Sequence, residues 1–171
     1  MREPFSRIIR IDALPKDGET VTIEATRAER KALAAFLELP SIEALTATLA
    51  VRPTAGGGAR ATGAVYGELT QTCVVTLEPF PAVVEEEIDV RFAPRAVDDA
   101  RPEEELSMGG EDEPDPVVDG RIDLGALAAE FFALGLDPYP RKAGAEFEPP
   151  AEPQADASPF AVLKGEAKKP G

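Results

Sequence analysis

The apolar and polar side chains alternate along most of residues 42 to 92, and this period of two constrains the fold more than any other feature. The alternation is clearest at 42–52 and 82–92, where apolar residues such as Val84 and Ile88 oppose acidic ones. Short links rich in glycine or proline separate the alternating stretches. Parallel strands would need crossovers of about a dozen residues, so the sequence predicts an antiparallel meander.

The only cysteine, Cys73, falls inside this alternating region. It lies on the apolar row of a predicted strand at 72–77, which favours a packing role for the thiol. Upstream, two short strands around the turn-like LPKDGE are expected to form either a hairpin or two edge strands. The full set of predicted strands is 5–11, 19–25, 42–52, 61–69, 72–77 and 82–92.

Two segments have the 3.6-residue period of helices. The first is predicted over 27–39, because Thr26 and Glu29 have the spacing of a capping box and Pro40 ends the run. The second begins after Asp123, a plausible N-cap, and ends at Gly135. Its predicted apolar stripe is Leu124, Leu127, Phe131 and Leu134. The predicted class is α+β, a meander packed with two helices, and the pattern allows either an open sheet or a barrel-like closure.

The composition divides the chain into one domain and a tail. Residues 98–116 contain nine acids and one arginine, interrupted by glycine and proline, which predicts a disordered acidic loop within a broader insert at 95–118. The α+β domain is expected to span 1–142. Residues 143–171 are rich in proline and predict an extended tail, whose SPFAVLK motif is a candidate docking segment in cis or in trans.

The formal net charge of −14 favours basic partners and opposes non-specific binding to phosphate backbones or anionic membranes. No apolar run is long enough to span a membrane, and a single cysteine cannot form an intrachain disulfide, so a cytoplasmic location is expected. Arg52 and Arg60 flank the glycine loop, while three further bases begin the first helix (Arg27, Arg30 and Lys31). Each is expected to be a surface charge, unless several converge on one face and contact RNA phosphates locally.

The residue types present exclude the commonest catalytic chemistry. The chain has no histidine and one cysteine, so it has neither a Ser-His-Asp triad nor the ligands of a zinc site. The glycines at 56–58 lack the following Lys-Ser/Thr of a phosphate loop. Two enzymatic options remain. Ser-Lys chemistry lacks a motif such as S-x-x-K, so ordinary surface polar groups are the better interpretation of the serines and lysines. Carboxylates of the acidic run could act with a hard cation, but a solvated loop is the better interpretation of that run. We therefore expect no catalytic residues, metal, cofactor or small-molecule substrate.

The order of motifs resembles that of the bacterial YceD family, which is associated with accumulation of the large-subunit ribosomal RNA. The similar features are GELTQTC in the meander, IDL at 122–124 with Glu130 and Pro138 in the second helical segment, and the PFAxL ending at 159–163. Many members have a C-x-R-C-like cysteine pair after the GEL segment. Here Cys73 takes the first place and Thr76 stands at the second, with no later cysteine.

The resemblance implies a non-enzymatic ribosome-biogenesis factor that supports accumulation or maturation of 23S rRNA and synthesis of the large subunit. The implied partner is large-subunit rRNA or, as the alternative, a basic large-subunit ribosomal protein that the acidic chain would shield. A soluble α+β domain with an unrelated partner is the remaining hypothesis. The candidate partner-binding residues are Asp123, Glu130, Phe131, Pro138, Tyr139, Pro159, Phe160 and Leu163.

Overall fold

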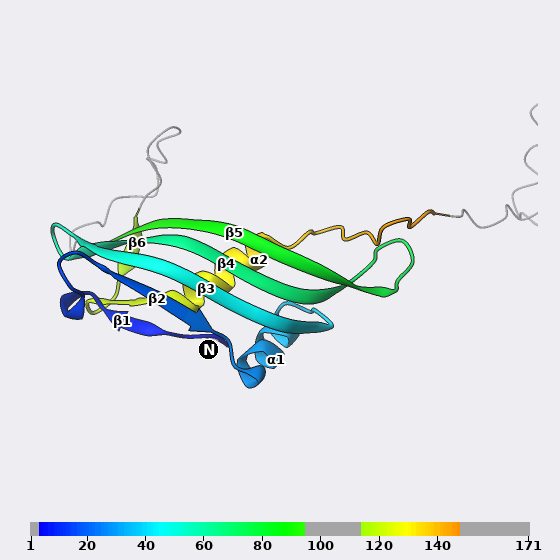
Figure 1. The fold of residues 1–171 in the computed structure, drawn as a ribbon, viewed down its shortest axis with the longest axis horizontal. Helices are drawn as coiled ribbons and strands as arrows, with labels where there is room; N and C mark the ends of the chain where they lie inside the picture. Colours follow the sequence, from blue (N-terminus) through cyan, green and yellow to red (C-terminus); the bar gives the residue numbers. More distant parts are fainter. Residues whose placement is uncertain (1–3, 95–113, 148–171) are drawn as a thin grey trace, which may run out of the picture.

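The computed structural model describes residues 4–94 and 114–147, and its main element is a five-stranded sheet (Figure 1). The strand order is β2-β3-β4-β5-β6. All neighbours are antiparallel except β5 and β6, so the predicted antiparallel meander is confirmed. The bounds are β2 Glu19–Glu24, β3 Ser41–Thr54, β4 Gly58–Thr72, β5 Pro79–Pro94 and β6 Asp115–Val117.

The sheet is open, and the barrel-like closure that the pattern allowed does not occur. Within the described residues, β2 pairs only with β3 at one edge, and β6 pairs only with the end of β5 at the other. The β6 strand itself arises at the end of the stretch predicted as a loop, where Val117 is buried in the core. The rest of the predicted acidic loop, residues 95–113, and the tail from residue 148 lie outside the described residues.

The first two predicted strands do not form a hairpin with each other. The strand β1, Ile8–Arg10, pairs with β7, Arg121–Asp123, in a separate two-stranded sheet. A short 3-10 turn, η1 (Ile11–Ala13), follows β1 and turns the chain back toward β2. Apolar burial favours this arrangement, because Ile9 of β1 packs against the core and Ile122 of β7 is buried in it.

The helix α1, Arg27–Phe36, begins as predicted and ends three residues early. Thr26 and Glu29 form the capping box, and the Glu29 carboxylate also accepts hydrogen bonds from both terminal nitrogens of Arg7. This arginine is the main reason that the pKa of Glu29 falls to about 2. Glu38 has a left-handed backbone (φ 56°), and the Leu39 N–H bonds the Ala34 carbonyl, which closes the helix by a Schellman-type turn.

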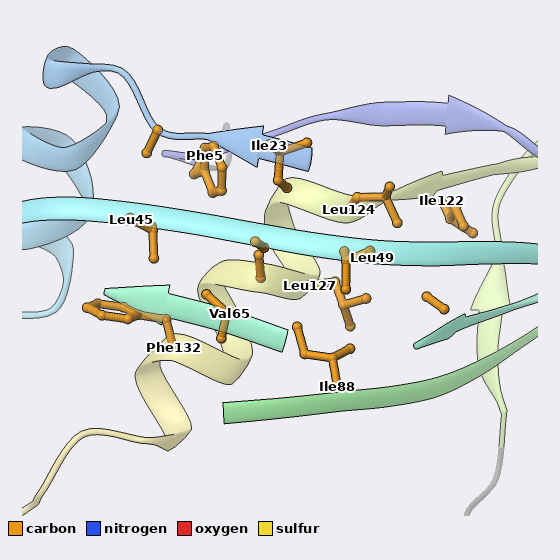
Figure 2. Close-up of a cluster of buried hydrophobic side chains, with 14 of the residues drawn as sticks. Phe5, Ile23, Leu45, Leu49, Val65, Ile88, Ile122, Leu124, Leu127 and Phe132 are labelled. Carbon is orange, nitrogen blue, oxygen red and sulfur yellow. The ribbon is translucent and has the colours of Figure 1, made fainter. Parts of the chain in front are cut away.

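The helix α2, Leu124–Leu134, packs on one face of the sheet and completes the core. Figure 2 shows Leu127 and Phe132 of α2 beside Val65 and Ile88 of β4 and β5. The predicted apolar stripe is wrong by one position at its C-terminal half, because Phe132 is buried whereas Phe131 is half-buried and Leu134 is exposed. Nearly every residue of α2 is apolar, so the periodicity of the sequence did not mark its inner face.

Candidate functional site

The turn that follows β4 differs from the sequence prediction and forms the centre of the candidate site. The stretches 61–69 and 72–77 are not two strands: β4 is continuous to Thr72, and Cys73 begins a turn. In this turn the Cys73 N–H donates to the Glu78 carbonyl, and the Leu77 N–H donates to the Cys73 carbonyl. Cys73 is fully buried, as its apolar character indicated, but it does not lie on the inner row of a strand.

A second segment, which follows α2, lies against this turn. The Val74 N–H donates to the Pro140 carbonyl at 2.9 Å, and the side-chain amide of Gln71 donates to the Asp137 carbonyl at 3.2 Å. The Lys142 ammonium pairs with the Glu78 carboxylate at 2.9 Å. We call the turn 73–78 and the segment 137–142 together the Cys73 junction. It joins GELTQTC to DPYP, two of the motifs that carried the family resemblance.

The thiol of Cys73 is the acceptor that links both segments. Its sulfur accepts the backbone N–H of Thr76 at 3.5 Å and that of Lys142 at 3.4 Å. Hydrogen bonding from the Thr76 side chain, followed by these two backbone donors, lowers the pKa of the Cys73 thiol to about 6. The hydrogen bonds of the junction therefore favour the thiolate form of Cys73, against the opposing effect of its burial.

Replacing Thr76 by valine is expected to raise the pKa of the Cys73 thiol from about 6 toward its ordinary value of 9.0. The folded pKa is the lower one, so the thiolate contribution to stability is complete above pH 9, and it disappears as the pH falls through about 6. Thiolate absorbance measured against pH tests this, with Thr72→Val as the matched control. A wild-type thiol that titrates near 9 would contradict the assignment.

Three large apolar side chains of the junction are exposed beside its Lys142–Glu78 ion pair. The side chains of Val74, Leu77 and Tyr139 are 45%, 77% and 73% exposed, and we call these three residues the apolar patch. Leu77 also has a left-handed backbone (φ 60°), which costs an apolar residue roughly 1 kcal/mol or more. Strained backbone conformations occur more often at functional sites than elsewhere, so this surface is a candidate for contact with a partner.

Among the predicted partner-binding residues, Asp123 has a structural role. Its Oδ1 accepts the N–H groups of Gly125 and Ala126 at the start of α2, and also the N–H of Arg7 at 2.7 Å. Its Oδ2 accepts the Ser6 hydroxyl. The carboxylate thus caps α2, as the sequence suggested, and it also fastens the N-terminal segment to that helix.

The other predicted residues divide into three groups. Pro138 and Tyr139 are exposed and lie in the Cys73 junction. Glu130, which is exposed, and Phe131, which is half-buried, lie on α2 and thus outside the two segments of the junction. Pro159, Phe160 and Leu163 lie outside the described residues. Val74 and Leu77 were not selected from the sequence. A strand over residues 72–77 would place Val74 on the polar row and Leu77 on the apolar row that faces the core.

Neither a metal cluster nor a membrane-spanning helix is found in the part of the chain that the structure describes. Residues 4–94 and 114–147 contain no group of three or more acidic or cysteine side chains placed to hold a metal ion. Within the same ranges, neither helix is long and apolar enough to cross a membrane.

The fold and the junction define an α+β protein with an open sheet, whose candidate site is a surface formed by two segments distant in sequence. A family model described as large ribosomal RNA subunit accumulation protein YceD matches residues 61–166, more than half of the chain. The chain belongs to the YceD family. Comparisons with curated proteins and with solved structures give no match.

Proposed function

We propose that this protein is a non-enzymatic factor, acting in the cytoplasm, that supports accumulation and maturation of 23S rRNA during synthesis of the large ribosomal subunit. The family match carries this proposal, because the family is named for accumulation of this RNA. Two features of the site support binding rather than catalysis: the apolar patch is exposed, and the thiol is buried. Binding surfaces of this kind stabilise a partner through a few apolar anchors.

Depletion of the protein tests the proposed function. Precursor and mature 23S rRNA and the profile of ribosomal subunits should be compared before and after depletion. We expect less mature 23S rRNA and a deficit of large subunits, and unchanged RNA and subunit levels would reject the proposal.

The apolar patch can be tested in the same cells by complementation. The double variant Leu77→Asn, Tyr139→Ala removes both large anchors, and asparagine tolerates the left-handed backbone at position 77. We expect it to fold normally and to restore 23S rRNA several-fold less well than the wild type. Phe36→Ala is the matched control, because Phe36 is also an exposed aromatic residue (65%) but lies on α1.

A second candidate function is shielding of a basic large-subunit ribosomal protein. The net charge of −14 would speed encounter with such a partner, and the apolar patch would hold it. Capture experiments at low and high salt distinguish the two candidates. Recovery of rRNA without any ribosomal protein would reject shielding.

A further inference from the structure

The strand β2 forms one edge of the main sheet (Figure 1), and the phase of its hydrogen bonds decides which backbone groups that edge presents. The Ala25 N–H donates to the Leu45 carbonyl, and this pair continues the antiparallel register of β2 on β3. In such a ladder every second residue bonds the neighbouring strand. The N–H and C=O groups of Val21 and Ile23 therefore point toward β3.

The alternate residues of β2 point their backbone groups away from β3, and both ends of this outer edge are closed. The Glu24 carbonyl accepts a hydrogen bond from the Arg7 side chain at 3.2 Å, which agrees with the outward direction of that residue. At the other end Gly18 has a left-handed backbone (φ 83°) and its N–H closes a turn, so the extended strand stops there. The open part of the edge therefore consists of Thr20 and Thr22.

Thr20 and Thr22 are exposed, and within residues 4–94 and 114–147 no hydrogen bond engages their outward N–H and C=O groups. Proteins usually protect such an edge with a lysine, a proline or a bulge. The six residues of β2, ETVTIE, include no lysine or proline, and the register of β2 on β3 has no bulge. The edge therefore offers two donors and two acceptors to an added strand.

We propose that this edge pairs with the same edge of a second copy of the chain, in an antiparallel, two-fold arrangement centred on Val21. In that register Thr20 of each copy faces Thr22 of the other. Two such pairs, each exchanging two bonds, give four backbone hydrogen bonds. A two-fold axis centred on either threonine would instead use Gly18, which is not extended, or Glu24, whose carbonyl already accepts a hydrogen bond.

The side chains of β2 also suit this register. The threonines of the two copies stand side by side on the outer face, which is a favourable cross-strand combination. Val21, which is half-buried at the edge, meets Val21 of the second copy. Glu19 falls opposite Ile23 of the second copy. Glu24 falls opposite Gly18, so in this arrangement no acid of β2 directly faces another.

The expected dimer is weak and reversible. A contact limited to one short strand lies below the roughly 1,200 Å² at which stable interfaces begin. The net charge of −14 on each copy adds repulsion. Salt screens repulsion between exposed charges and leaves backbone hydrogen bonds in place, so the dimer should become more stable as the salt concentration is raised. An interface held by ion pairs would respond in the opposite direction.

Substitutions at position 22 of the full chain test the pairing. Thr22→Pro removes an outward N–H and keeps the ladder bonds to β3, which belong to Val21 and Ile23; proline is tolerated at such edge positions. Thr22→Val is the matched control, because it keeps the N–H and the β-branched shape. If thermal unfolding shows that Thr22→Pro does not fold, Val21→Lys takes its place, since it sets like charges opposite each other at the two-fold axis.

Sedimentation equilibrium measures the association up to millimolar concentrations of protein, at which a weak dimer is populated. We expect a concentration-dependent dimer for the wild type and for Thr22→Val. Thr22→Pro should weaken it by roughly tenfold or more, because each dimer loses two hydrogen bonds. The amide hydrogens of Thr20 and Thr22 should exchange fast in dilute wild-type protein and more slowly as the dimer forms, whereas that of Val21 stays protected throughout.

Three results would overturn the proposal: a wild type that stays monomeric at every concentration, a dimer that Thr22→Pro leaves unchanged, or a dimer that salt weakens. Slower exchange at Thr20 and Thr22 only after another protein or RNA is added would assign the edge to that partner and reject the second copy. The dimer goes beyond the proposed function, and depletion of the protein tests that function separately.

Discussion

Replacing Phe132 by alanine is expected to lower the free energy of unfolding by about 3–5 kcal/mol, the usual cost of truncating a buried phenylalanine. The side chain is 0% exposed and lies against β4 at Gly67. A Cβ atom added at Gly67 would stand 2.4 Å from the Phe132 ring, so the ring occupies the space that the missing side chain leaves. Truncation would leave a cavity that the sheet backbone cannot close.

Urea denaturation followed by circular dichroism measures this loss. The adjacent residue supplies the matched control, since Phe131 is half-buried and Phe131→Ala creates less of a cavity. We expect the loss for Phe131→Ala to be clearly smaller. Equal losses for the two variants would show that the inner face of α2 has been assigned wrongly.

Replacing Asp123 by alanine is expected to cost about 3 kcal/mol, more than the roughly 1 kcal/mol of an ordinary helix cap. The excess comes from the N-terminal segment, because the same carboxylate accepts the Arg7 N–H and the Ser6 hydroxyl. Removal of the carboxylate would leave four donors without their acceptor, two of them at the start of α2. Both α2 and β1 should therefore loosen together.

Two measurements separate the cap from the N-terminal attachment. Ser6→Ala removes only the hydroxyl donor, so its cost should stay near 1 kcal/mol, that of a single hydrogen bond. Amide hydrogen exchange should then show faster exchange in Ile8–Arg10 for Asp123→Ala than for Ser6→Ala. Faster exchange confined to the first turn of α2 would mean that Asp123 acts as a cap alone.

The elements with a clear local pattern could be predicted from the sequence. The alternation from residue 42 onward specified the meander, and Thr26 with Glu29 specified the start of α1. The capping role of Asp123 could also be predicted from the sequence, because an acidic residue directly before an apolar helix has few other roles. Its attachment to Ser6 and Arg7 was not, since those residues lie 117 and 116 positions away.

The errors came from stretches in which the local pattern was ambiguous. Residues 72–77 alternate like a strand, yet hydrogen bonds from Cys73 to Glu78 and from Val74 to Pro140 favour a turn. The helix α2 is apolar on nearly all sides, so periodicity selected Phe131 instead of Phe132. Contacts with a distant segment decided both the turn at 72–77 and the burial of Phe132. A short window of sequence does not include those distant residues, so it could not predict either result.

By itself the sequence determined the class of fold, the family and the kinds of chemistry that are excluded, because these depend on composition, periodicity and motif order. Only the tertiary structure decided which residues meet. The register of β2 on β3 directed the backbone groups of Thr20 and Thr22 to the outer edge of the sheet. A shift of one residue would have turned them toward β3, since the ladder bonds alternate along an antiparallel strand. Packing of α2 on the sheet likewise brought DPYP to Cys73 and formed the junction.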